Sequence, residues 1–139
     1  MKYFEIKVLD EEDYVFIETL KTLGISRKVA MTMAYLMNVN EASAHEIEIS
    51  TGLRQSEVSL AMRLMRKQSW VSVRSEKQAG KGRPIIIYSL VAPVDEILSY
   101  YENKIDKESQ AIISIIKKLK AIIKKLKVMS KKVPYTLSN

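Results

Sequence analysis

The chain has 139 residues, of which 47% are hydrophobic and 28% are charged, a composition typical of an ordinary soluble domain with one core. It has no cysteine and one histidine, which excludes a disulfide framework and most metal and triad sites, so we expect no metal, no cofactor and no enzymatic activity. The net charge is +7, and the absence of a long apolar run or signal peptide favours a cytoplasmic protein with no membrane partner.

The first forty residues predict an arm followed by two helices. Phe4, Ile6 and Val8 alternate with polar residues, which indicates a short strand or extended arm before Asp10 caps the first helix. The helix is expected to end at Gly24. Its inward side chains are expected to be Tyr14, Val15, Ile17 and Leu20. Ser26 can cap a second helix. The inward face of that helix is expected to comprise Ala30, Met33, Ala34 and Met37.

The next segment predicts a helix, a tight turn and a second helix. Ser43 and Glu46 have the spacing of a capping box, in which each side chain satisfies a backbone N–H of the first turn. Gly52 can close this helix in a left-handed conformation, with Leu53 as the accompanying apolar contact. The following helix, expected from about residue 55 to 68, has a buried face at helical spacing. That face comprises Val58, Ala61, Met62 and Met65.

A basic β-hairpin is predicted directly after these helices. Trp70 to Arg74 alternates like a strand, SEKQAGKGRP is a turn-rich loop, and IIIYSL is a second strand. Residues 54–84 hold eight basic and two acidic side chains, so positive charge is concentrated in this helix and hairpin.

The run TGLRQSEVSLAMRLMRKQSWV resembles the second and third helices of winged helix-turn-helix regulators of the MarR and TrmB kind. The features that carry the resemblance are Gly52, Val58, Ser59, Met62 and Met65 in this order. LKTLGISRKVA also resembles the entry to TrmB-type DNA-binding domains, and the resemblance covers roughly residues 14 to 92. The family usually has a small residue where this chain has Glu48, and a Gly where it has Ser69.

The helix at 55–68 and the hairpin carry the side chains that we expect to contact DNA. Short or forked polar groups suit base edges, and Arg63 can pair with guanine O6 and N7, while Leu60 can meet a thymine methyl. The base-reading residues are expected to be Gln55, Ser56, Ser59, Leu60 and Arg63. The phosphate and minor-groove residues are expected to be Arg54, Arg66, Lys67, Arg74, Lys77, Lys81 and Arg83. The alternatives are a solvated basic helix and a plain hairpin turn.

A long C-terminal helix is predicted from Pro93 to about Ser130. Nine of ten a and d heptad positions are apolar, which is typical of a coiled coil. The dimerisation residues are expected to be Leu98, Tyr101, Ile105, Ile112, Ile115, Leu119, Ile122 and Leu126. Ile113, Ile116 and Ile123 widen the apolar stripe, so the N-terminal helix of either copy is expected to pack there too. Charge favours an antiparallel pair, but the orientation is left open.

These observations predict a mainly α fold, an α+β winged helix with a three-helix core, a two- to three-stranded wing and a long dimerisation helix. The expected domains are a DNA-binding domain at 1–92, a coiled-coil helix at 93–130 and a flexible tail at 131–139. The leading interpretation is a homodimeric, sequence-specific transcriptional regulator that binds double-stranded DNA, with any small-molecule effector left open. An architectural protein with little sequence specificity and a winged-helix protein-interaction module are the alternatives.

Overall fold

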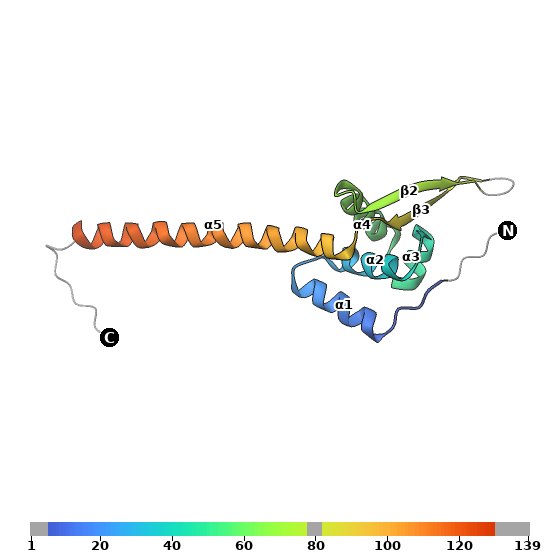
Figure 1. Ribbon diagram of the computed structural model, residues 1–139, viewed down its shortest axis with the longest axis horizontal. Coiled ribbons are helices and arrows are strands. Elements are labelled where there is room, and N and C mark those ends of the chain that lie inside the picture. The colour runs from blue at the N-terminus through green and yellow to red at the C-terminus, as the bar shows by residue number, and fades with distance from the viewer. Residues whose placement is uncertain (1–5, 78–81, 130–139) are drawn as a thin grey trace. The chain divides into compact units, whose positions relative to one another are not determined.

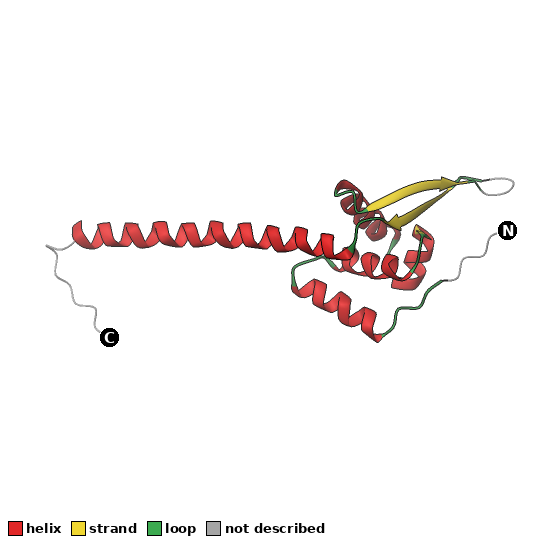
Figure 2. Cartoon of the chain, viewed as in Figure 1, coloured by secondary structure: helices red, strands yellow, loops and turns green. Residues whose placement is uncertain are grey.

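A computed structural model describes residues 6–77 and 82–129. The chain divides into two units, Met1–Val94 and Asp95–Asn139. The first unit contains four helices, α1 (Glu11–Thr22), α2 (Arg27–Asn38), α3 (Ala44–Thr51) and α4 (Gln55–Lys67), and a small sheet (Figure 1). The sheet comprises β1 (Ala42–Ser43), β2 (Val71–Glu76) and β3 (Ile85–Leu90). Helix α5 (Val94–Met129) follows, so the predicted winged-helix architecture with a long C-terminal helix is confirmed (Figure 2).

Helix α2 is the centre of the first unit, because every residue from 29 to 36 is buried. It contacts α1, α3, α4 and β3. Ala30, Met33 and Ala34 face this core as predicted, whereas Met37, at 46% exposed, does not. Met37 lies in the last turn of α2, beyond the eight enclosed positions, so the prediction for this residue was wrong.

Helix α1 begins at a capping box in which Asp10 and Asp13 each accept a backbone N–H of the other at 2.9 Å. The side-chain amide of Asn38 also donates to Asp13 at 2.9 Å, which ties the start of α1 to the end of α2. Ile17 and Leu20 are buried as predicted. The inward placement of Tyr14 and Val15 was wrong, because their flank of α1 is left uncovered and they are 44% and 66% exposed.

The segment before α1 is extended but forms no strand from residue 6 to 10, and Phe4 lies outside the described residues. Lys7 nevertheless anchors it, since its backbone N–H donates to the Tyr35 hydroxyl at 3.4 Å and its carbonyl accepts from the Ser50 hydroxyl at 2.7 Å. The arm interpretation holds for this stretch, and the strand alternative was wrong.

Helices α3 and α4 are joined by the turn that the sequence predicted. Ser43 and Glu46 form the capping box at 3.2 and 2.9 Å. Gly52 is left-handed, with φ of 74°, and its N–H donates to the Glu48 carbonyl at 2.9 Å. Leu53 is buried beside it. The backbone N–H of Arg54 donates to the Glu57 carboxylate at 3.0 Å, which fixes the start of α4.

The sheet has the order β1-β3-β2, with both pairs antiparallel. Val71 pairs with Leu90 and Glu76 with Ile85, so the hairpin is in register along its length. Tyr88 in the central strand pairs with Ala42 on one side and Val73 on the other. Trp70 precedes β2 rather than starting it, and its N–H donates to the Met65 carbonyl at 2.9 Å. This bond couples the end of α4 to the wing.

Two left-handed residues flank the helices of this motif and behave differently. Gly52 closes α3, whereas Ser69 follows α4 with φ of 62°, a left-handed value that glycine adopts at lower cost than serine. A side chain raises the cost of this conformation by roughly 1–2 kcal/mol. Ser69 therefore retains a strain that Gly would remove.

Gly52→Ala and Ser69→Gly are expected to shift the free energy of unfolding in opposite directions. A Cβ at position 52 meets nothing within 4 Å, so the loss of about 1 kcal/mol comes from the backbone conformation alone. Ser69→Gly relieves the same strain and should gain about 0.5 kcal/mol after the entropy cost of glycine. Urea unfolding of both variants measures the two changes.

Ser75→Gly is the matched control, because Ser75 lies in β2 with extended backbone. It should lose about 0.5–1 kcal/mol through chain entropy. If Ser69→Gly destabilises the protein as Ser75→Gly does, the strain assigned to Ser69 is absent.

Helix α5 is described by itself. It has 36 residues, about 54 Å at 1.5 Å per residue. Its apolar side chains from Ile105 to Leu126 are each between 39% and 59% exposed. No helix in the described part of the chain is long and apolar enough to cross a membrane.

Candidate nucleic-acid interface

Helix α4 presents one polar face and buries the other. Val58, Ala61, Met62 and Met65 are at most 2% exposed, so the helix is held by a full stripe of apolar contacts as predicted. The five residues expected to read bases all lie on the solvent side. One row of exposed side chains runs along α4 on the side that faces away from the core. It comprises Ser56, Leu60, Arg63 and Lys67, at spacings of four, three and four residues.

Leu60 is 43% exposed, and the neighbouring Leu64 is 49% exposed. Exposure of a leucine side chain to water at the centre of a polar helix face does not stabilise the fold. This exposure fits an apolar contact with a partner such as a thymine methyl group.

A pocket of about 450 Å³ lies between α4 and the central strand β3. Its lining residues are Ser59, Met62, Arg63, Arg66, Lys67 and Tyr88. The lining includes three cationic side chains and two hydroxyls but no carboxylate. The chemistry of this pocket therefore suits an anion with several acceptor oxygens.

The three cations of the pocket, Arg63, Arg66 and Lys67, are exposed to solvent. Within residues 6–77 and 82–129, no carboxylate forms an ion pair with Arg63, Arg66 or Lys67. Adjacent cations repel one another, and a bound anion would relieve this repulsion.

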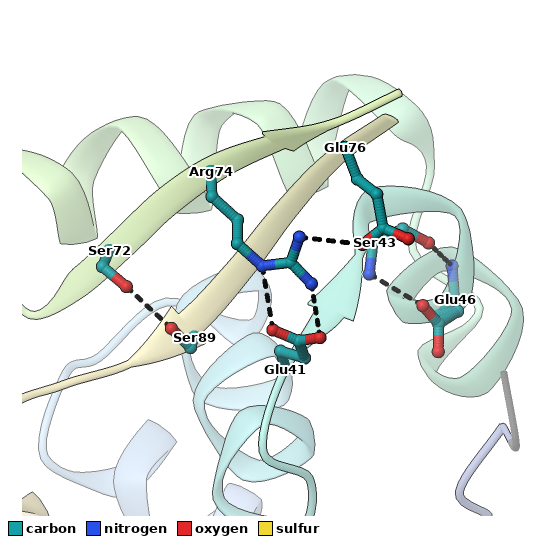
Figure 3. A network of polar contacts seen from close by, with 7 residues as sticks. All are labelled: Glu41, Ser43, Glu46, Ser72, Arg74, Glu76 and Ser89. Carbon is teal, nitrogen blue, oxygen red and sulfur yellow. Dashed lines mark hydrogen bonds and ion pairs between the residues drawn. The ribbon is translucent and has the colours of Figure 1, made fainter. Parts of the chain in front are cut away.

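Arg74 shows the opposite arrangement (Figure 3). Its Nε donates to Glu41 at 3.1 Å and its Nη1 lies 2.8 Å from Glu76, while Nη2 completes a bidentate pair with Glu41. Hydrogen bonds from the guanidinium to Glu41 and then Glu76 raise the pKa of Arg74 further above its usual range. Because Glu41 precedes β1 and Arg74 lies on β2, the pair bridges the outer strands of the sheet. The geometry indicates that Arg74 positions the wing.

Lys77 and Arg83 lie exposed on either side of the hairpin loop, beyond the ends of β2 and β3. Lys81, the third wing cation expected from the sequence, lies outside the described residues. Arg54 is exposed at the N-cap of α4. The hairpin also has a hydroxyl pair, Ser72 with Ser89 at 2.7 Å, which joins β2 to β3 (Figure 3).

Sequence reasoning missed Tyr88 and the pairing of Arg74. Tyr88 was seen only as part of an apolar strand, and the register of the hairpin was needed to bring it to α4. The Glu41–Arg74 contact joins residues 33 positions apart, and no local pattern indicates it. Groups of three or more His, Asp or Glu side chains that could hold a metal are absent from the described part of the chain.

No protein-family model and no curated protein matches this sequence. Solved structures do match the fold. A possible transcriptional regulator from Methanosarcina mazei Go1 is 15% identical with a TM-score of 0.56, over 85% of this chain and 95% of that chain. A MarR family regulator from Silicibacter pomeroyi is 16% identical with a TM-score of 0.46, over 91% and 84% of the two chains. A MarR family regulator from Neisseria meningitidis is 15% identical with a TM-score of 0.44, over 86% and 89%.

The match to the Methanosarcina structure shows that this chain has the fold of that protein. At 15% identity the similarity speaks for the fold and not for individual side chains. The winged-helix architecture inferred from the run around Gly52 is confirmed by this match and by the order of helices and strands.

Proposed function

We propose that the protein is a homodimeric DNA-binding transcriptional regulator, with α4 in the major groove and the β2–β3 wing at the minor groove. One observation carries the proposal: Arg63, Arg66 and Lys67 lie on the polar face of α4, next to the wing, and form no ion pair with any carboxylate that the structure describes. The rest of the same helix is fixed by buried apolar residues, as a reading element requires. The solved structure with the same fold is described as a possible transcriptional regulator.

The side chains divide into two kinds of contact. Base edges are read by exposed side chains in the first three turns of α4, with Arg63 as the residue able to pair bidentately with guanine. The proposed base-reading set is Gln55, Ser56, Ser59, Leu60 and Arg63. The proposed phosphate and minor-groove set is Arg54, Arg66, Lys67, Lys77, Lys81 and Arg83. Arg74 leaves this second set, because its donors are engaged by Glu41 and Glu76.

Dimerisation is proposed to use α5. Burying one exposed isoleucine or leucine contributes roughly 1.5–3 kcal/mol, and α5 exposes nine such residues between Ile105 and Leu126. The lysines of this helix avoid the a and d positions. We therefore propose 93–130 as the dimerisation segment and 1–92 as the DNA-binding domain. The uncovered flank of α1, with Tyr14 and Val15, is a second apolar surface available to a partner.

An architectural role is favoured by one observation, the cluster of eight basic residues without an acid in residues 109–139. Such a protein would bind DNA with little regard to sequence. A protein-interaction module would show no salt-dependent affinity for DNA.

The proposal is tested by a selection experiment, in which the purified full-length protein is mixed with random and genomic DNA and the bound fragments are sequenced. A regulator should enrich a two-fold symmetric motif with half-sites about one helical turn apart. Recovery of fragments without a shared motif would favour the architectural role. No recovery at low salt would favour the interaction module.

Arg66→Gln and Arg74→Gln are expected to differ in their effect on the salt dependence of DNA binding. Arg66 can neutralise a phosphate, so its loss should reduce the slope of log affinity against log salt by about one per chain, or about two for the dimer. Arg74 already faces two carboxylates, and its loss should leave the slope nearly unchanged. Fluorescence anisotropy from about 50 to 200 mM salt measures both slopes.

The two variants remove the same charge from neighbouring elements of the wing motif, so each is the control for the other. Equal reductions in slope would mean that Arg74 contacts phosphate as well, against the pairing seen in the structure.

A further inference from the structure

We infer that the pocket between α4 and β3 seats one phosphate group of the DNA backbone, with the Tyr88 and Ser59 hydroxyls as donors beside Arg66. This inference rests on the proposed function and goes beyond it, because it adds Tyr88 as a contact residue and places one strand of the duplex. The pocket has a volume of about 450 Å³ and no acidic lining residue.

The two walls of the pocket are held rigidly before any ligand arrives. Tyr88 lies in the central strand, and its backbone is fixed by Ala42 of β1 and Val73 of β2. The opposite wall is the flank of α4 that carries Ser59 and Arg66, and Met62 at 2% exposed secures this flank to the core. The backbone on both sides of the pocket is therefore fixed before a ligand binds, and only side chains have to become ordered.

The free donors in the pocket match a phosphate. The hydroxyls of Tyr88 and Ser59 bond to no other residue within 6–77 or 82–129, and Arg66 forms no ion pair there. A guanidinium donates two parallel hydrogen bonds to phosphate oxygens, and hydroxyl groups can reach the remaining oxygens from the other wall. A tetrahedral anion can accept from both walls at once.

The position of the pocket favours a phosphate group of the DNA backbone over a free phosphate ion as its ligand. The outward row of α4, on one side of the pocket, is proposed to lie in the major groove, and the hairpin on the other side is proposed to reach the minor groove. These two grooves are separated by a sugar-phosphate strand. A strand crossing from α4 to the wing would bring its phosphates past Tyr88, and Arg63 would stand between the pocket and the base edges.

Tyr88→Phe tests this inference in the full-length protein. Tyr100→Phe on α5 is the matched control, because Tyr100 lies outside the a and d heptad positions and outside the proposed DNA-contact sets. Removal of the Tyr88 hydroxyl should weaken binding of the duplex enriched by the selection experiment at least about tenfold, as expected for a hydrogen bond to a charged group. The salt slope should stay unchanged because no charge is lost. Tyr100→Phe should bind as the wild type does, and Arg66→Gln should lose both affinity and about one unit of slope per chain, or about two for the dimer.

Duplexes with one uncharged methylphosphonate in place of a phosphate locate the contact. The wild type should lose affinity at one position per half-site, and Tyr88→Phe should lose several-fold less at that same position, because the two changes remove one interaction. Equal losses for the two proteins at every position would overturn the inference while DNA binding itself stands. Absence of any salt-dependent duplex binding would overturn the proposed function and the inference together.

Competition by inorganic phosphate, exchanged for chloride at constant ionic strength, tests whether the pocket binds a free phosphate ion instead of a phosphate of the DNA backbone. Little competition is expected at millimolar phosphate, since one group without the rest of the duplex binds weakly. Competition at low millimolar phosphate that Tyr88→Phe abolishes, with no position-dependent methylphosphonate effect, would instead assign the pocket to a free phosphate ligand.

Discussion

The double variant Ile112→Gln/Leu119→Gln replaces two residues at heptad a positions of α5, which form part of the proposed dimer seam. It is expected to be a monomer and to bind a duplex with two half-sites about 10²-fold or more weakly. Both side chains are more than half exposed in the single chain, so they contribute little to it and can be buried only by a partner. Two chains lose four apolar contacts, at roughly 1.5–3 kcal/mol each. Without the partner, the second half-site is no longer bound at high effective concentration.

Sedimentation equilibrium and anisotropy titration of the same samples measure the two effects. Lys117→Gln with Lys124→Gln is the matched control, because these lysines occupy heptad positions opposite the a and d seam. The control should remain dimeric. A wild-type protein that sediments as a monomer at micromolar concentration would contradict the proposed role of α5.

Arg63→Ala is expected to cost about 1–3 kcal/mol on the selected duplex and to flatten discrimination at one base pair. Arg63 lies both in the outward row of α4 and at the pocket, with no counter-ion among the described carboxylates, so its guanidinium is available to a base edge. Titration against the selected duplex and all single-base variants at one position measures the loss.

Arg83→Ala is the comparison, because Arg83 is an exposed cation of the wing. It should weaken binding to all sequences alike and reduce the salt slope by about one per chain, or about two for the dimer. If Arg63→Ala also lowers affinity uniformly on selected and random duplexes, α4 does not read bases, and the architectural role should replace the regulator.

The parts of the fold that the sequence predicted well are those specified by local patterns. The capping box of Ser43 and Glu46, the left-handed Gly52 and the apolar stripe of α4 each depend on residues within one or two helical turns. The hairpin followed from alternation and a turn-rich loop. The second strand is where it was expected, whereas the first runs from Val71 to Glu76 rather than from 70 to 74, so Ser75 and Glu76 belong to the strand and not to the loop.

The predictions that failed depended on what covers a surface. Tyr14 and Val15 have the spacing of an inward face, but periodicity does not say whether another element lies opposite. Met37 fits the same stripe as Met33 and lies past the end of the enclosed part of α2. Exposed apolar residues of this kind remain candidates for contact with a second copy.

The candidate site was predictable as a set of residue types and not as an arrangement. Arg66, Arg74 and Lys67 looked equivalent in the sequence, since each is a cation in a basic segment. The structure separates them, because the fold brings Glu41 to Arg74 and brings Tyr88 to Arg66. Both distinctions arise from sheet pairing between distant segments, which a single sequence does not display.

The central claim, that the protein binds DNA sequence-specifically, is tested most directly by two dissociation constants of the full-length protein at 150 mM salt. One is measured on the duplex enriched by selection, and the other on a random duplex of equal length. A sequence-specific winged-helix regulator should bind the selected duplex at least about 10³-fold more tightly. Affinities within a few-fold of each other, with a steep salt dependence for both, would contradict sequence-specific regulation by this protein.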